Sequence, residues 1–168
     1  TTRCAVCDAP GELLCAPCAE RLAYVDALRA CPRCGAPYGA VQCTECSRTM
    51  LASARRASLP CDAMASAVAF DEAAQRLVGT FKDRSEARLA AVLGSLIARV
   101  VPPAWMAERP VVTFVPATRA ARARRGFDHG QLLAQATADR LGLPLAALLD
   151  QPSSADQRRL GRRARLGN

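Results

Sequence analysis

The fold is decided by residues 1–46, which read TTRCAVCDAPGELLCAPCAERLAYVDALRACPRCGAPYGAVQCTEC. This stretch holds four Cys-x-x-Cys pairs: Cys4/Cys7, Cys15/Cys18, Cys31/Cys34 and Cys43/Cys46. Two thiolates separated by two residues can chelate one Zn²⁺ from a tight turn, and two such turns complete a tetrahedral site. These cysteines therefore predict two closed structural zinc sites, with no ligand position left for a catalytic water.

Two other uses of cysteine compete with zinc binding. A disulfide framework is typical of small secreted domains, but the chain shows no apolar signal-peptide core, and a ninth cysteine, Cys61, has no partner. A redox Cys-x-x-Cys is expected beside a βαβ pattern, which does not surround these pairs. Metal-held thiolates fit a reducing compartment, so we expect a cytoplasmic protein. No apolar run is long enough for a transmembrane helix, and we expect no membrane insertion.

The sequence leaves open which cysteines share a metal ion. Consecutive pairing joins the first pair to the second and the third to the fourth, whereas cross-braced pairing joins the first to the third and the second to the fourth. Between the two halves, Leu22, Val25 and Leu28 recur at helical spacing, which predicts a helix over 20–29. Such a helix would separate two compact ribbons and favours consecutive pairing. Gly35 suits the tight turn after Cys34.

The positive charge gathers in the last third of the chain. The whole sequence carries a formal charge of +8, and the residues from Arg119 onward carry +6 of it. A surface of this charge attracts anions, either the phosphates of a small ligand or those of a nucleic acid. Of the 23 basic residues only Lys82 is a lysine, so part of the arginine content reflects composition and a merely solvated surface stays an alternative.

The pattern after the cysteines alternates short strands with helices. We expect a double zinc ribbon over 1–48, a linker over 49–62 and an α/β domain over 63–168. Strands are expected at 65–70, 111–115 and 145–149, the second buried on both faces as in a parallel sheet. Helices are expected from an N-cap at Asp71, from an N-cap at Ser85 to the stop at Pro102, and from an N-cap at Asp128 to Gly142.

The segment 116–130 is the predicted ligand-binding loop. It follows the carboxyl end of a parallel strand, where open α/β sheets bind their ligands, and it leads to a helix N-terminus. It carries four arginines and a glycine: Arg119, Arg122, Arg124, Arg125 and Gly126. Guanidinium groups fork onto phosphate oxygens, and glycine permits close approach of the backbone to a ligand.

Three segments resemble the ComF family, phosphoribosyltransferase-like proteins named from bacterial competence. Residues 111–144, VVTFVPATRAARARRGFDHGQLLAQATADRLGLP, are similar to the family segment around its Arg-Gly-Phe motif. Residues 77–97, LVGTFKDRSEARLAAVLGSLI, are similar to its lysine-containing turn. Residues 151–168 resemble a later segment through Gln157, Leu160, Arg163 or Arg165, and Asn168. The double zinc ribbon is also a family feature.

The resemblance implies a partial type I phosphoribosyltransferase fold, a glycosyltransferase class that binds phosphoribosyl pyrophosphate with Mg²⁺. It gives a pyrophosphate-binding role to Arg125 and Gly126, and also to Arg119, while Lys82 and Arg84 add phosphate contacts. Asp128 and His129 stand where the family usually has Asn and Gln. The sequence given ends at Asn168, before the acidic residues and Thr-Thr-Gly loop that hold the ribose phosphate in the family. We therefore expect either a fragment or a short form, inactive in phosphoribosyl transfer on its own.

Three functions follow from these patterns. The first is a ComF-like protein that binds a phosphorylated small molecule, with Mg²⁺ and phosphoribosyl pyrophosphate entering only if the full-length form is active. The second is a protein that handles single-stranded DNA with the DNA-uptake machinery, to which the resemblance also points. Against it, single-strand binders stack bases on exposed aromatics, and most of the seven aromatic residues here are expected in the core. The third is a zinc-stabilised module that docks a partner protein.

Overall fold

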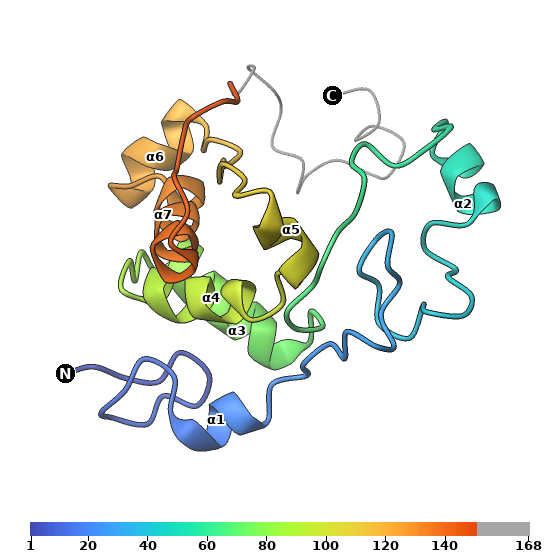
Figure 1. Cartoon of the computed structure of the whole chain (residues 1–168). Helices are drawn as coiled ribbons and strands as arrows, with labels where there is room; N and C mark the ends of the chain where they lie inside the picture. Colours follow the sequence, from blue (N-terminus) through green and yellow to red (C-terminus); the bar gives the residue numbers. More distant parts are fainter. Residues whose placement is uncertain (151–168) are drawn as a thin grey trace.

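The structure, a computed structural model, describes residues 1–150 of the 168-residue chain (Figure 1). The predictions made on residues 151–168 lie outside this range. Within it the chain forms α1 (Ala16–Glu20), α2 (Arg48–Ser53), α3 (Glu72–Lys82), α4 (Leu89–Ala98), α5 (Pro103–Ala107), α6 (Arg119–Arg125) and α7 (His129–Leu141). None of the helices in residues 1–150 has the length and apolar character needed to cross a membrane.

The core of the molecule is helical. Its most deeply buried large side chains are Leu77 and Phe81 of α3 and Leu89 of α4. α7 packs along α4 and adds partly buried apolar side chains to the same cluster. Phe81 also meets Phe127, with ring centroids 5.8 Å apart. The apolar stripes predicted for these helices are therefore core, as their spacing indicates.

The first cysteine-rich turns are part of this core. Leu22 belongs to the buried cluster, and four side chains between the first cysteines pack against it, namely Ala5, Val6, Leu13 and Leu14. Residues 31–46 and α2, by contrast, lie to one side of the helices α3–α7 (Figure 1). Their contact with the returning chain includes Gly35, whose Cα faces Met64 and Ser66. The two halves of the cysteine-rich region thus have different surroundings. The predicted domain limits stay predictions.

Helix ends follow the predicted capping in three of four cases. Asp71 accepts from the N–H of Ala74 at 2.9 Å and begins α3, and Asp128 caps α7. Gly142 ends α7 in a left-handed conformation, with φ of 65°. The N-cap predicted at Ser85 is wrong. Ser85 itself adopts a left-handed φ of 57° in the turn after α3, and α4 starts at Leu89 without a side-chain cap.

Two predicted segments have a different secondary structure. The helix predicted over 20–29 does not form: Glu20 is the last residue of α1, and residues 21–29 are not helical. Tyr24 pairs in extended conformation with Val68, and Leu28 is 90% exposed. The arginine-rich segment 116–130 is not an open loop, because residues 119–125 form α6. Thr118 caps that helix by accepting from the N–H of Ala121 at 3.2 Å, a start signal that the sequence analysis missed.

The strands expected from the sequence are reduced to isolated bridges within residues 1–150. Val68 makes one antiparallel bridge with Tyr24, and Val112 makes one parallel bridge with Leu145. The second bridge has two backbone hydrogen bonds, from Val112 N to Pro144 O (2.8 Å) and from Ala146 N to Val112 O (3.0 Å). Val111 and Val115 are 48% and 69% exposed, so the prediction of burial on both faces is wrong. No sheet of a phosphoribosyltransferase fold is formed in the described residues.

The crossing of α4 and α7 gives a first prediction. A Cβ at Gly94 would lie 2.8 Å from Ala136 Cβ and 2.9 Å from the Ala136 carbonyl carbon, so Gly94→Ala should push the helices apart. We expect a loss of about 1–3 kcal/mol in the free energy of unfolding, measured by chemical denaturation. Gly79→Ala in α3 is the matched control. It meets nothing within 4 Å and should stabilise by roughly 0.5–1 kcal/mol through helix propensity. Equal stability of the two variants would contradict this packing.

Candidate metal centres and arginine helix

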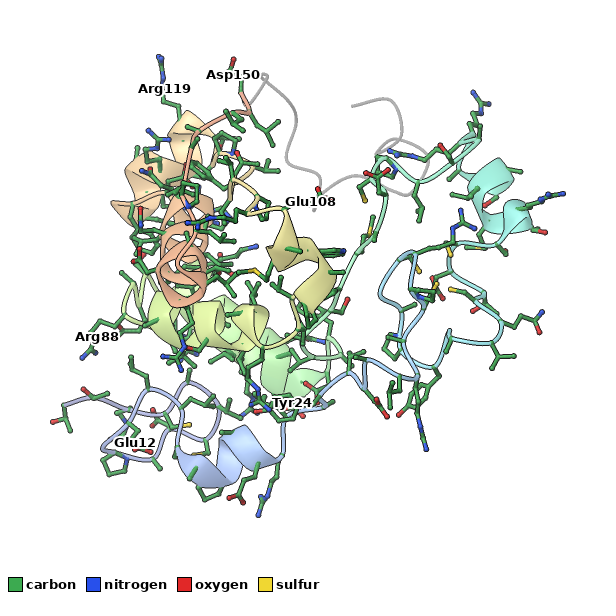
Figure 2. All side chains as sticks on the ribbon, viewed as in Figure 1. Glu12, Tyr24, Arg88, Glu108, Arg119 and Asp150 are labelled. Atoms are coloured by element: carbon green, nitrogen blue, oxygen red, sulfur yellow. The ribbon has the colours of Figure 1, made fainter. Side chains whose placement is uncertain are left out.

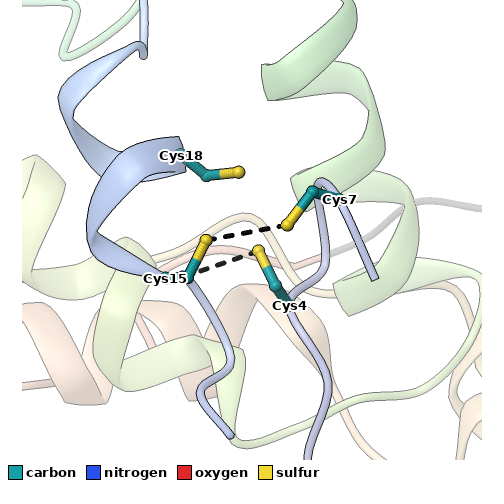
Figure 3. Close-up of side chains that lie close together, drawn as sticks. All are labelled: Cys4, Cys7, Cys15 and Cys18. Carbon is teal, nitrogen blue, oxygen red and sulfur yellow. Dashed lines mark hydrogen bonds between the residues drawn. The ribbon is translucent and has the colours of Figure 1, made fainter. Parts of the chain in front are cut away.

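The eight paired cysteines gather into two groups. Within each group all four sulfur atoms lie within 4.8 Å of one another, and the groups are Cys4, Cys7, Cys15, Cys18 and Cys31, Cys34, Cys43, Cys46. Figure 3 shows the first group, with two sulfurs from one turn facing two from the start of α1. The structure therefore has the consecutive pairing, and the cross-braced alternative is wrong.

The sulfur separations fit a tetrahedral metal ion. Sulfurs bound to one Zn²⁺ at 2.3 Å lie about 3.8 Å apart at the corners of a tetrahedron. The observed separations are 3.6 Å for Cys7 and Cys15, 3.7 Å for Cys31 and Cys46, and 3.5 Å for Cys34 and Cys43. A disulfide would need about 2.05 Å, and the cysteines of both groups are free thiols. Donor set and geometry thus suit one structural Zn²⁺ in each group.

Tight turns place the sulfurs. In the first group, Asp8 has a left-handed φ of 64°, and its N–H donates to the Cys4 carbonyl at 2.9 Å. In the second, Gly35 has φ of 67° and donates to Cys31 O at 2.9 Å, as predicted for this glycine. Gly39 was not predicted from the sequence. A Cβ there would lie 2.7 Å from Cys31 Cβ and 3.2 Å from Cys43 Sγ, so the chain passes the metal ligands only without a side chain.

The thiols of each group differ in how readily they ionise. Burial raises the pKa of the Cys4 thiol, but backbone N–H groups directed at its sulfur outweigh this and bring the pKa to about 6. Contact with the Cys15 and Cys7 sulfurs raises the pKa of Cys18 to about 12. The second group repeats this split, with a pKa of about 6 for Cys31 and about 12 for Cys34. Four neighbouring thiolates repel one another, and a cation bound by all four sulfurs would favour their deprotonated form.

The predicted phosphate residues fall in different surroundings. The side chain of Arg125 is only 8% exposed, and its guanidinium faces the end of α3. Its Nε donates to the Lys82 carbonyl at 2.7 Å, and its Nη2 lies 3.7 Å from Asp83 Oδ1. Its Nη1 lies 3.3 Å from His129 Nδ1. Arg125 and Lys82 are thus brought together, through a contact that fastens α6 to α3. The pyrophosphate role of Arg125 stays a prediction.

The other predicted residues do not join Arg125 in one site. Gly126 ends α6 with φ of 80°, and its N–H donates to Arg122 O at 2.8 Å. Arg119 begins α6 and points away from the helical core (Figure 2). Arg84 lines a separate cavity of about 520 Å³ between residues 4–8 and α3. Any phosphate contact of Arg84 would therefore be made beside the first cysteine group.

Asp128 occupies the N-terminus of α7, which the sequence predicts to be part of a phosphate-binding loop. Its carboxylate is buried and accepts from the backbone N–H of Ala117 (2.8 Å), Gly130 (2.9 Å) and Gln131 (3.2 Å). The Arg122 guanidinium donates to it at 3.0 Å. An internal carboxylate therefore takes the donors that would otherwise face an external anion. This arrangement joins residue 117, α6 and α7.

His129, the one histidine of the chain, is half-buried between charged groups. Burial lowers the pKa of its imidazole, and the nearby Lys82 and Arg125 lower it further, against smaller opposite effects of Asp128 and Asp83. The neutral ring can then accept from the Arg125 guanidinium through Nδ1. His129 supports the Arg125 contact, and it has no second imidazole with which to ligate a metal.

Comparisons with protein-family models, with curated proteins and with solved structures find no match for this chain. The ComF resemblance therefore stays a prediction based on the quoted segments.

The metal centres give a second prediction. Wild-type protein should contain two zinc ions per chain, and Cys7→Ser and Cys34→Ser, which alter the same position of each group, should each lose one. Only the first group packs on the helical core. We therefore expect Cys7→Ser to lower the thermal midpoint of the helical circular-dichroism signal clearly more than Cys34→Ser does. Elemental analysis checks the zinc content. Equal shifts, or fewer than two zinc ions in wild type, would refute the assignment.

A third prediction concerns acid stability. Burial alone would raise the pKa of the Asp128 carboxyl, but the donors from Ala117, Gln131, Arg122 and Gly130 outweigh it and hold the pKa below its usual value. Its contribution to stability is therefore full above the unfolded pKa of about 3.9 and is lost as the pH falls through the lower folded value. At neutral pH Asp128→Asn should cost roughly 1–3 kcal/mol.

Chemical denaturation at neutral pH and again near pH 3 checks this prediction. The difference in the free energy of unfolding between wild type and Asp128→Asn should be smaller near pH 3. Asp139→Asn, on the exposed side of α7, is the control and should change little at either pH. A stability difference that does not change with pH would mean that the charge of Asp128 contributes nothing to the free energy of unfolding.

Proposed function

We propose that the chain is a zinc-stabilised, phosphate-binding protein of the ComF type that contacts its ligand from α6. The observation that carries this is the parallel bridge between Val112 and Leu145 on either side of α6 and α7. Two extended segments that run in parallel through a helical crossover have their carboxyl ends at the same edge, where ligands of such units bind. α6 follows the first of these ends and carries the arginines.

The free guanidinium groups of α6 are the proposed contacts. Arg119 and Arg124 are exposed, and within residues 1–150 neither has a hydrogen-bond or ion-pair partner. Arg122 already bonds Asp128, and Arg125 already bonds Lys82 O. Two unpaired guanidinium groups suit phosphate oxygens well, because each can donate in bidentate fashion. We therefore place the first phosphate contacts at Arg119 and Arg124, with Arg125 holding the helix that presents them.

The ComF resemblance makes phosphoribosyl pyrophosphate with Mg²⁺ the ligand to test first. Arg84 and Lys82 belong to the proposal only as flanking positive charge, because Arg84 lines the cavity beside the first cysteine group. The proposal covers ligand binding and does not include phosphoribosyl transfer.

Single-stranded DNA is the second candidate ligand, and one observation favours it. The expectation that most aromatics lie in the core is wrong for four of the seven. Tyr24, Tyr38, Phe70 and Trp105 are 42%, 79%, 71% and 38% exposed. Exposed aromatic rings stack on nucleobases while arginines bind the phosphate backbone, and affinity of that kind falls steeply with salt.

A fourth prediction separates these ligands from diffuse charge. The double variant Arg119→Ala/Arg124→Ala should weaken binding of phosphoribosyl pyrophosphate roughly tenfold or more, because two charge-assisted contacts are lost. Isothermal titration measures this, and oligothymidine titrated over a salt series tests the second candidate. Arg140→Ala, an exposed arginine in the last turn of α7, is the control and should bind as wild type.

Arg125→Ala separates a role in holding α6 on α3 from a role in binding the ligand. It should lower thermal stability, because it leaves the Lys82 carbonyl without this donor. Equal losses of affinity in the Arg119/Arg124 and Arg140 variants would mean that net charge alone attracts the ligand, and the proposal would fail. Loss confined to oligothymidine would transfer the function to single-stranded DNA.

A further inference from the structure

The lobe built around the second cysteine group carries three exposed large hydrophobic side chains. We call residues 26–46 the second cysteine lobe. Its Leu28, Tyr38 and Val41 are 90%, 79% and 102% exposed, whereas the residues at its centre, Cys31, Gly35 and Cys46, are buried. The lobe is therefore closed around its metal site and presents its apolar side chains outward.

A backbone hydrogen bond brings the loops that carry these side chains together. The N–H of Ala40 donates to Arg29 O at 3.0 Å, so the residue after Leu28 meets the residue before Val41. Leu28 is held in its turn by a bond from its own N–H to Asp26 Oδ1 at 2.9 Å. Leu28 and Val41 thus flank one bond, and Tyr38 lies two residues away from it. We call these three residues the lobe patch.

The backbone at Tyr38 supports a role for its side chain. Tyr38 has φ of 60°, in the left-handed region where a residue with a Cβ is strained and glycine is not. Burial within its own chain does not explain why a tyrosine stands at this position, because its ring is mostly exposed. A contact of the ring with another molecule would explain it.

Charge decides which class of molecule fits the lobe patch. Within the second cysteine lobe two arginines, Arg29 and Arg33, balance two acids, Asp26 and Glu45. Arg29 and Asp26 pair with each other at 3.6 Å. One Zn²⁺ with four thiolates adds two negative charges. The lobe is thus neutral without zinc and negative with it, on a chain of net charge +8, and it does not attract a phosphate backbone.

Size decides against a second copy of this chain. Three side chains of this kind expose on the order of 400 Å² together, the size of a single functional patch. A stable dimer buries about 800 Å² on each partner. We propose that the lobe patch docks a short apolar segment of another protein, with basic residues beside its apolar anchors to match the charge of the zinc-bound lobe. This site is separate from the phosphate contacts proposed on α6.

The test uses the full zinc-loaded chain and a displayed library of random peptides. Selection should enrich peptides with large apolar residues beside Lys or Arg. Fluorescence anisotropy with an enriched peptide should then show roughly tenfold or weaker affinity for Leu28→Ser/Val41→Ser and for Tyr38→Ser. Leu148→Ser is the matched control, since Leu148 is 65% exposed elsewhere in the chain, and it should bind as wild type. Zinc content of two ions per chain verifies that each variant is folded around its metal sites.

Three results would overturn the proposal. One is the absence of enriched peptides, or peptide binding that the patch variants leave unchanged. Another is loss of oligothymidine binding in the patch variants, which would make the lobe a nucleic-acid surface. The last is a concentration-dependent dimer in sedimentation that Leu28→Ser/Val41→Ser dissociates, which would make the occupant a second copy.

Discussion

Closure of the first four cysteines into one tetracysteine group is the constraint on which the helical core depends. The turn from Cys4 to Cys18 packs Val6, Leu13 and Leu14 against the buried cluster, and the cysteine group brings the two ends of this turn together. A segment this short has too little apolar surface to hold that shape alone, whereas a structural zinc site contributes about 10–16 kcal/mol in small peptides. Leu22, directly after α1, then completes the buried cluster. The turns of the first cysteine group thus supply one wall of the core.

A second set of contacts fixes the arginine helix on that core. Arg125 bonds the carboxyl end of α3 from one side, and Asp128 bonds Arg122, residue 117 and the first turn of α7 from the other. Both groups are largely shielded from water, so their charge-assisted bonds are stronger than those of surface pairs. The outcome is a short helix held at both ends, with Arg119 and Arg124 left to solvent. Stability and ligand contact are therefore divided among neighbouring arginines of one helix.

The sequence predicts the metal sites well because their chemistry is local. Cys-x-x-Cys spacing sets the thiolate pairs, and the caps Asp71, Asp128 and Gly142 are equally local signals.

The parts of the structure that the sequence predicts poorly depend on distant contacts. Leu22, Val25 and Leu28 have helical spacing, but Leu22 is taken into the core and Tyr24 pairs with Val68, so no helix forms. Residues 111–115 are apolar enough for a buried strand, yet in the described residues their pairing is a single bridge, flanked by Pro110, Pro116 and Pro144, and their other face stays exposed.

The roles of individual arginines also depend on distant contacts, and the sequence does not predict them. Nothing in the composition of segment 116–130 distinguishes Arg125, which is buried against Lys82, from Arg119, which is exposed. One acidic residue of this segment could have helped. A carboxylate at position 128, beside so many arginines, indicates an internal partner for one of them, and the structure gives it to Arg122.

Zinc titration of the metal-free full chain, followed by far-ultraviolet circular dichroism, tests the central claim most directly. If the first metal site forms one wall of the core, helical signal should rise as zinc binds and should reach its limit by two ions per chain. A metal-free chain that already shows the full helical signal, unchanged on adding zinc, would contradict the account.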